Sequence, residues 1–178
     1  MKSKINTKAI MKVMWQHVRK YKGRALLVLF LVAIAKTADT VIIPLFFKRL
    51  FDLLGGEIEA TSEQIPTLLI GTLLIILVLR LIGWVAWRSF AAVNNWFQPR
   101  VMADLTQTSH EYLHGHAYKF FSNSFTGSLV RKVNRLSRSF EVLADQFQFV
   151  FVPLCVTVVG TVIVLWSRSP FLTGVLMI

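Results

Sequence analysis

The sequence predicts an all-α membrane protein whose long helices continue into the cytoplasm as a helical hairpin. Of its 178 residues, 54% are hydrophobic and only 16% are charged, and the mean hydropathy is +0.58. The apolar residues form three stretches long enough to cross a bilayer as helices, which takes about 20 residues each. A soluble domain of this size would not need such stretches. Between the second and third lies a long basic segment of helical composition.

The three apolar stretches, residues 25–47, 66–87 and 146–167, are predicted to span the bilayer. The third contains no charged residue. A fourth begins at Pro170, and because the sequence stops inside it we expect the chain to be part of a longer protein. The single cysteine, Cys155, excludes a disulfide within the chain.

The basic residues predict a multi-pass protein of the plasma (inner) membrane with a cytoplasmic amino terminus. Residues 1–24 contain Lys and Arg but no acidic residue, whereas the loop 55–66 contains only glutamates as charged residues. The segment 88–145 is basic again. Because cytoplasmic loops retain the Lys and Arg excess, both basic segments are expected inside and the acidic loop outside. This topology accounts for the net charge of +11 without a nucleic-acid partner.

Residues 1–23 are predicted to form an amphipathic helix on the cytoplasmic membrane surface. Its apolar positions recur at helical spacing between basic residues; they are Ile10, Val13, Met14, His17, Val18 and Tyr21. A disordered basic tail is one alternative. A cleaved signal peptide is another, since residues 33–35 read A-I-A. The apolar run continues past them as far as a span requires, which favours an uncleaved helix.

Ionisable residues within the first two spans indicate a possible translocation cavity. Lys36 and Asp39 are three residues apart and can pair on one helical face. Alternatively this face, with Thr37 and Thr40, lines a cavity that meets a polar or charged substrate. Arg80 either extends toward the cytoplasmic interface or points into the same cavity.

A metal-binding pattern lies near the middle of the chain. His110, Glu111 and His114 read H-E-x-x-H, the spacing of zinc proteases. The run around them is polar and a third ligand is missing, because His116 points elsewhere on a helix and Glu141 is the only later Glu. We therefore expect no metal site and no catalytic residue in this chain, and a membrane metalloprotease is the weakest alternative.

The segment from Arg88 to Glu141 is predicted to form two extended helices joined by a turn. It contains one proline, Pro99, and one turn-rich piece, FFSNSFTGS at residues 120–128. Two helical arms of this length would hold the turn far from the membrane, at about 1.5 Å per residue. We expect a turn in that position to contact a partner.

The turn and its flanks resemble the first intracellular loop of type I ABC exporters. That family shows an fF pair followed by tGeLvsRv, and here Phe120-Phe121 precede Thr126-Gly127 and Leu129-Val130. The basic first helix and the long hairpin agree with the resemblance, as does Pro44 near the end of the first span. Residues 24–178 would then form an incomplete six-helix domain, from the first span to the start of the fourth. The chain departs from the family pattern at three places, Ala117, Ser128 and Arg135-Leu136.

The resemblance implies a short coupling helix, about residues 116–124, that docks on a nucleotide-binding domain. Aromatic anchors and polar neighbours suit such an interface; the residues implied are His116, Tyr118, Lys119, Phe120, Phe121, Ser124, Thr126 and Gly127. Alternatively the Phe pair packs between the two arms. The sequence has no G-x-x-x-x-G-K-[ST], so ATP and Mg²⁺ would be bound by a domain in cis or in trans.

The resemblance further implies an ATP-hydrolysing translocase that exports an unidentified substrate by alternating access. Its partners would be the lipid bilayer and a second transmembrane half, in a homodimer or a heterodimer. A membrane anchor or assembly module that uses the basic hairpin to bind anionic lipid is an alternative. A secondary transporter is another, although only Pro44 and Pro153 suggest broken helices.

Overall fold

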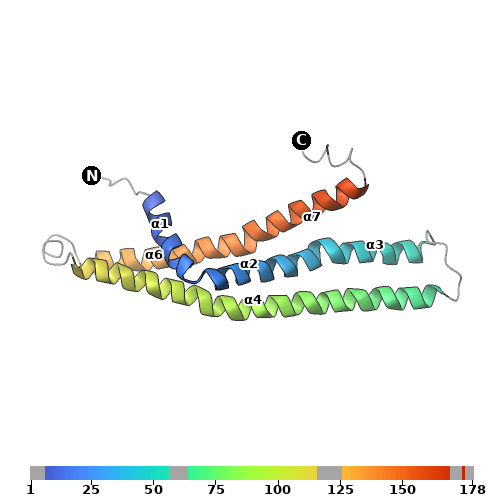
Figure 1. Ribbon diagram of the computed structural model, residues 1–178, viewed down its shortest axis with the longest axis horizontal. Helices are drawn as coiled ribbons and strands as arrows, with labels where there is room; N and C mark the ends of the chain where they lie inside the picture. The colour runs from blue at the N-terminus through green and yellow to red at the C-terminus, as the bar shows by residue number, and fades with distance from the viewer. Residues whose placement is uncertain (1–6, 57–63, 116–125, 169–173, 175–178) are drawn as a thin grey trace. The chain divides into compact units, whose positions relative to one another are not determined.

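The computed structural model describes residues 7–56, 64–115, 126–168 and 174. These residues contain no strand, so the all-α prediction is confirmed. The helices are α1 (Thr7–Lys20), α2 (Lys22–Thr37), α3 (Ile43–Leu54), α4 (Ile65–Gly115), α6 (Thr126–Gln146) and α7 (Val152–Arg168), with π-helical turns η1 (Ala38–Ile42) and η2 (Phe147–Phe151) (Figure 1).

Three continuous helical stretches in the described residues are long and apolar enough to cross a membrane. They run over Lys22–Leu54, Ile65–Tyr112 and Arg131–Ser167, and they contain the three predicted spans. Helix α4 alone has 51 residues, more than twice the about 20 that a bilayer requires. The predicted fourth span lies outside the described residues except for Gly174.

Each of the two π-helical turns is followed, after one residue, by a proline. Pro44 lies in the first turn of α3 after η1, and Pro153 lies in the first turn of α7 after η2. Proline cannot donate a backbone hydrogen bond, and its ring crowds the carbonyl four residues earlier. A turn with i→i+5 bonding admits one more residue and accommodates the ring. The predicted breaks at these prolines are therefore widened turns in continuous helices, whereas Pro99 lies within α4 itself.

The chain divides into two compact units, and each is described separately. Unit 1 comprises residues 1–28 and 92–148. Its core contains Met14 from α1, three side chains of α4, and Phe140 from α6. The α4 members, Phe97, Val101 and Leu105, are spaced four residues apart and so lie on one helical face. The cytoplasmic halves predicted for the hairpin thus pack against each other and against α1.

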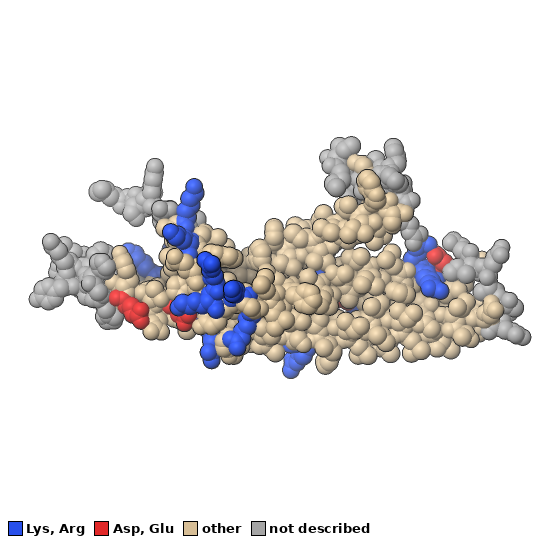
Figure 2. All heavy atoms as spheres, in the orientation of Figure 1, with Lys and Arg blue, Asp and Glu red and all other residues tan. Residues whose placement is uncertain are grey.

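The apolar face of α1 is covered by protein, whereas the sequence predicted that it rests on the membrane surface. Met14 and His17 are only 5% and 6% exposed, and Val18 packs against the core of unit 1. Helices α4 and α6 present the apolar side chains that cover this face. The opposite face of α1 is exposed and mostly basic; it consists of Lys8, Met11, Lys12, Trp15 and Arg19. Figure 2 shows Lys and Arg side chains gathered over α1 and the start of α2.

Unit 2 comprises residues 29–91 and 149–178. Its buried residues are mostly small or β-branched, and an aromatic cluster joins α4 to η2. In that cluster the ring centroids of Trp87 and Phe90 are 5.1 Å apart, and Phe149 lies 5.6 Å from Phe90. Large apolar side chains such as Leu73 and Leu77 are more than half exposed. Exposed apolar surface on this scale is expected of helices that face lipid.

Candidate functional site

An open pocket of about 670 Å³ lies within unit 2. Helix α2, turn η1 and helix α4 supply its walls; the lining residues are Ala35, Lys36, Asp39, Arg80, Leu81, Gly83, Trp84 and Trp87. Three of the four residues predicted for a translocation cavity, Lys36, Asp39 and Arg80, therefore line one pocket. Two tryptophans and a leucine make the rest of the wall apolar.

The charges in this pocket are organised around one ion pair. Nη1 of Arg80 donates to Oδ1 of Asp39 at 2.9 Å. Both side chains remain partly exposed, at 57% and 42%. Pairing lowers the cost of placing each charge in an apolar surrounding. Because the pair is internally neutral, the net charge of the pocket is that of Lys36.

The predicted pair between Lys36 and Asp39 is wrong, because Asp39 bonds Arg80 from another helix. Asp39 lies in η1, where more residues fill each turn than in an α-helix, so positions three apart no longer lie one above the other. No carboxylate lies within 4 Å of the Lys36 ammonium in the described residues. Thr40, the fourth predicted residue, donates its hydroxyl to the carbonyl of Lys36 at 2.7 Å.

The predicted coupling residues fall largely outside the described part of the chain. Residues 116–125 are not described, and this range holds six of the eight. Thr126 and Gly127 are the first two residues of α6, but their side chains are not described. The docking of this turn on a nucleotide-binding domain therefore stays a prediction.

The zinc-protease pattern lies near the end of α4. Glu111 accepts a hydrogen bond from Gln107 at 2.9 Å. Among the described residues no three His, Cys, Asp or Glu side chains gather as a metal site. The side chain of His114 and all of His116 lie outside those residues, so the absence of a metal site remains a prediction.

Sequence reasoning missed the polar contacts that hold α1 on α4. Nδ1 of His17 donates to the carbonyl of Val13 at 2.8 Å, and its Nε2 lies 3.0 Å from the hydroxyl of Thr108. Asp104 accepts from Lys20 and from the Tyr21 hydroxyl, each at 3.3 Å. The contacts to Thr108 and Asp104 join positions more than 80 residues apart, and no local sequence pattern predicts them.

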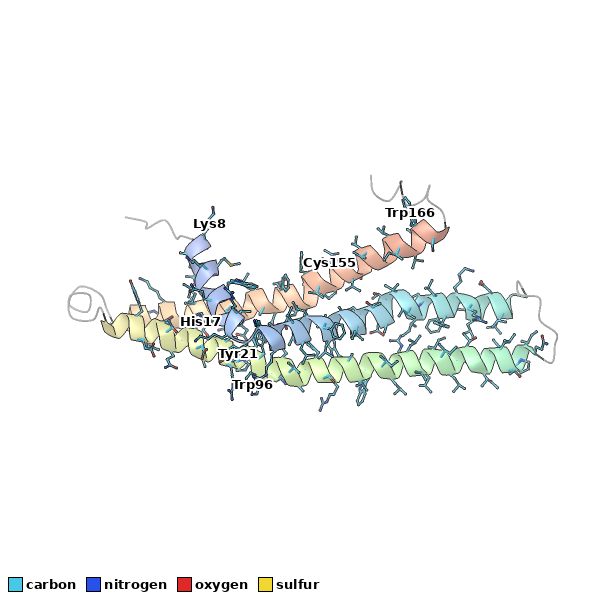
Figure 3. The ribbon with its side chains drawn as sticks, viewed as in Figure 1. Lys8, His17, Tyr21, Trp96, Cys155 and Trp166 are labelled. Carbon is cyan, nitrogen blue, oxygen red and sulfur yellow. The ribbon has the colours of Figure 1, made fainter. Side chains whose placement is uncertain are left out.

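Two arginines stack on one tryptophan in unit 1. The guanidinium carbon of Arg24 lies 3.2 Å from the ring centroid of Trp96, and that of Arg100 lies 4.1 Å from it. Tyr21 meets the same indole edge-on, with 5.9 Å between ring centroids. Figure 3 shows Tyr21 and Trp96 close together near the junction of α1 and α2. No sequence pattern predicts this cluster, because its members come from two distant segments.

The apolar helices and the partly charged pocket define a multi-pass helical membrane protein. The sequence model of the ABC transporter transmembrane region matches residues 26–178. The chain therefore belongs to the family of ABC transporter transmembrane regions, and the resemblance seen in its turn motif and spans is confirmed. No curated protein and no solved structure matches it.

Proposed function

We propose that this chain is a transmembrane part of an ATP-driven exporter that works by alternating access. The observation that carries the proposal is the family match over residues 26–178. ATP and Mg²⁺ would be bound by a nucleotide-binding domain outside this sequence, in cis or on a separate subunit. A second transmembrane half, identical or different, would complete the pathway.

In this proposal the arms formed by α4 and α6 transmit movement from the coupling turn. Their support is the packing of unit 1, where Phe97, Val101 and Leu105 of α4 lie in one core with Phe140 of α6. Between the arms, Nε2 of Gln98 also donates to Asp145 of α6 at 3.0 Å. A close-packed pair of helices deforms little, so a displacement at one end is carried to the other.

The pocket around Lys36 is the proposed contact with substrate. Its walls combine one ion pair, one additional cation and two indole rings. Ionisable groups in membrane-spanning segments usually mark substrate or ion pathways, because they are costly to keep in lipid. We place the amino terminus in the cytoplasm on the basis of the Lys and Arg bias.

The proposal is tested by measuring how strongly substrate stimulates ATP hydrolysis in the complete transporter. Phe121→Ala removes a coupling anchor, whereas Phe51→Ala makes the same change at an exposed position of α3, 66% exposed, as a matched control. We expect Phe121→Ala to lower substrate-stimulated ATPase activity while membrane insertion stays normal. Unchanged stimulation, or an equal loss in both variants, would contradict the coupling role.

A binding experiment tests the partnership directly. A cysteine placed at residue 121 in a Cys155→Ser background should cross-link to the nucleotide-binding domain. A cysteine placed at Phe51 should not, because the proposal assigns α3 to the outer half of the first span. If no ATP-binding domain copurifies with the chain under conditions that preserve membrane complexes, the proposed function fails.

A further inference from the structure

We propose that Arg24 and Arg100, stacked on Trp96, bind the phosphate of an anionic lipid headgroup. Arg24 comes from the first turn of α2, and the other two residues come from α4. Both guanidinium carbons lie within 4.1 Å of the same ring centroid. The fold thus brings two cations together from positions 76 residues apart, although like charges repel.

The acidic side chains of unit 1 do not neutralise this pair. In the described residues no carboxylate lies within 4 Å of either guanidinium. Asp104 is engaged by Lys20 and Tyr21. The other acidic residues described in unit 1 are Glu111, Glu141 and Asp145, against eleven Lys and Arg; those cations are Lys8, Lys12, Arg19, Lys20, Lys22, Arg24, Arg100, Arg131, Lys132, Arg135 and Arg138. An anion from outside the chain would supply the missing charge.

The geometry suits a phosphate. A guanidinium that stacks by its face leaves its N–H edges available, and those edges match two phosphate oxygens. The guanidinium carbons of Arg24 and Arg100 cannot be further apart than the sum of their distances to the centroid of the Trp96 ring. A phosphate carries oxygens on several sides and can accept from both. Stacking also restricts the two long side chains before the ligand arrives, which lowers the entropy lost on binding.

The sequence position of Arg24 selects a lipid as the source of that phosphate. Arg24 directly precedes the apolar stretch 25–47, so the start of α2 lies at the level where a span leaves the headgroups. Tyr21 and Trp96 contact each other there, and these two residue types are enriched at membrane interfaces. No acidic residue precedes Asp39 in the sequence. Anionic headgroups are therefore attracted to this end of the chain.

The exposed face of α1 supports the same assignment. Lys8, Lys12, Trp15 and Arg19 recur at helical spacing on the side opposite the core. Because protein covers the apolar face of α1, it is the basic face that is free to contact lipid headgroups. It would hold further anionic headgroups loosely, whereas the stacked arginines would hold one specifically.

The test exchanges guanidinium groups for ammonium groups without changing charge. The double variant Arg24→Lys, Arg100→Lys keeps the surface potential but loses the planar, stacked donors. The purified chain in neutral detergent is titrated with dioctanoyl phosphatidylglycerol, and bound lipid is counted by native mass spectrometry. We expect the affinity of the first bound lipid to fall about tenfold or more, as the loss of one charge-assisted contact predicts.

The matched control is Arg135→Lys, Arg138→Lys, the same exchange at two exposed arginines of α6. It should leave the affinity unchanged, and circular dichroism should show equal helix content in all forms. Equal binding by wild type and by the Arg24, Arg100 variant would overturn the proposal, as would equal losses in both double variants. Displacement of the lipid by inorganic phosphate alone would assign the site to a free anion and overturn the lipid assignment. Equally strong binding of phosphatidylcholine would overturn the selection for an anionic headgroup.

Discussion

The contact between Gly160 of α7 and Val41 of η1 gives a sharp test of the packing in unit 2. Gly160 is buried, and a Cβ placed on it would overlap Cγ2 of Val41 far inside van der Waals contact. It would also lie 3.3 Å from Cγ1 of the same side chain. Small residues allow helix backbones in membranes to approach closely. Gly160→Ala should therefore force the two segments apart.

Two opposing effects set the size of the change. Overfilling a packed site costs about 1–3 kcal/mol, and Val41 cannot readily rotate away because a β-branched side chain has one strongly preferred rotamer in a helix. Replacing Gly by Ala inside a helix contributes about 1 kcal/mol in the other direction. We therefore expect a net loss of about 1 kcal/mol. Val41→Ala removes both overlapping methyl groups and leaves the new Cβ 3.4 Å from the Val41 Cβ position, an ordinary contact.

The free energy of unfolding is measured by titrating the chain from mild detergent into sodium dodecyl sulfate and following helix loss by circular dichroism. Gly71→Ala in α4 is the matched control, since nothing lies within 4 Å of its added Cβ. It should be neutral or stabilising by up to about 1 kcal/mol. The double variant Val41→Ala, Gly160→Ala should be more stable than Gly160→Ala alone. If Gly160→Ala is as stable as Gly71→Ala, the close approach of α7 to η1 is wrong.

Three further predictions concern the charged pocket and the attachment of α1. In a Cys155→Ser background, Lys36→Cys and Asp39→Cys should react with a charged, membrane-impermeant maleimide, and protection of both in every nucleotide state would exclude a water-filled pathway. Arg80→Gln should destabilise the chain by about 1 kcal/mol or less, because it removes the partner of a carboxylate that remains partly exposed; adding Asp39→Asn should restore part of that loss in the same unfolding titration, and no recovery would show that the pair contributes nothing. His17→Ala removes two hydrogen bonds and should cost about 1–3 kcal/mol, whereas an unchanged unfolding midpoint would show that the His17 hydrogen bonds do not contribute to holding α1.

The helices and their approximate ends could be predicted from the sequence, because apolar length and helical composition act locally. Helix α4 illustrates this. Its 51 residues include an apolar half and a polar half, and no turn signal separates them. Pro99 did not end the helix, since a single proline in a long helix can be tolerated with a local distortion.

The partners of the helical faces could not be predicted in the same way. The apolar spacing around Met14 indicates that one face of α1 is covered, but lipid and protein cover an apolar face equally well. Only the folded chain shows that α4 and α6 cover it. The prediction of the ion pair in the pocket was wrong for a related reason. A local rule favoured Lys36 for Asp39, whereas the actual partner, Arg80, lies 41 residues away on another helix.

The attachment of α1 bears on how the proposed exporter would move. Helix α1 shares its core with the arms of α4 and α6, and the bonds from His17 and Asp104 join it to α4. Close-packed elements shift as a body, so the displacement of the arms that alternating access requires would carry α1 with it. On the lipid proposal, α1 and the stacked Arg24 and Arg100 are also held to anionic headgroups. Each transport cycle would then move these residues relative to the headgroups that bind them. Anionic lipids of the cytoplasmic leaflet that bind one of the two alternating-access states more tightly would shift the equilibrium toward that state.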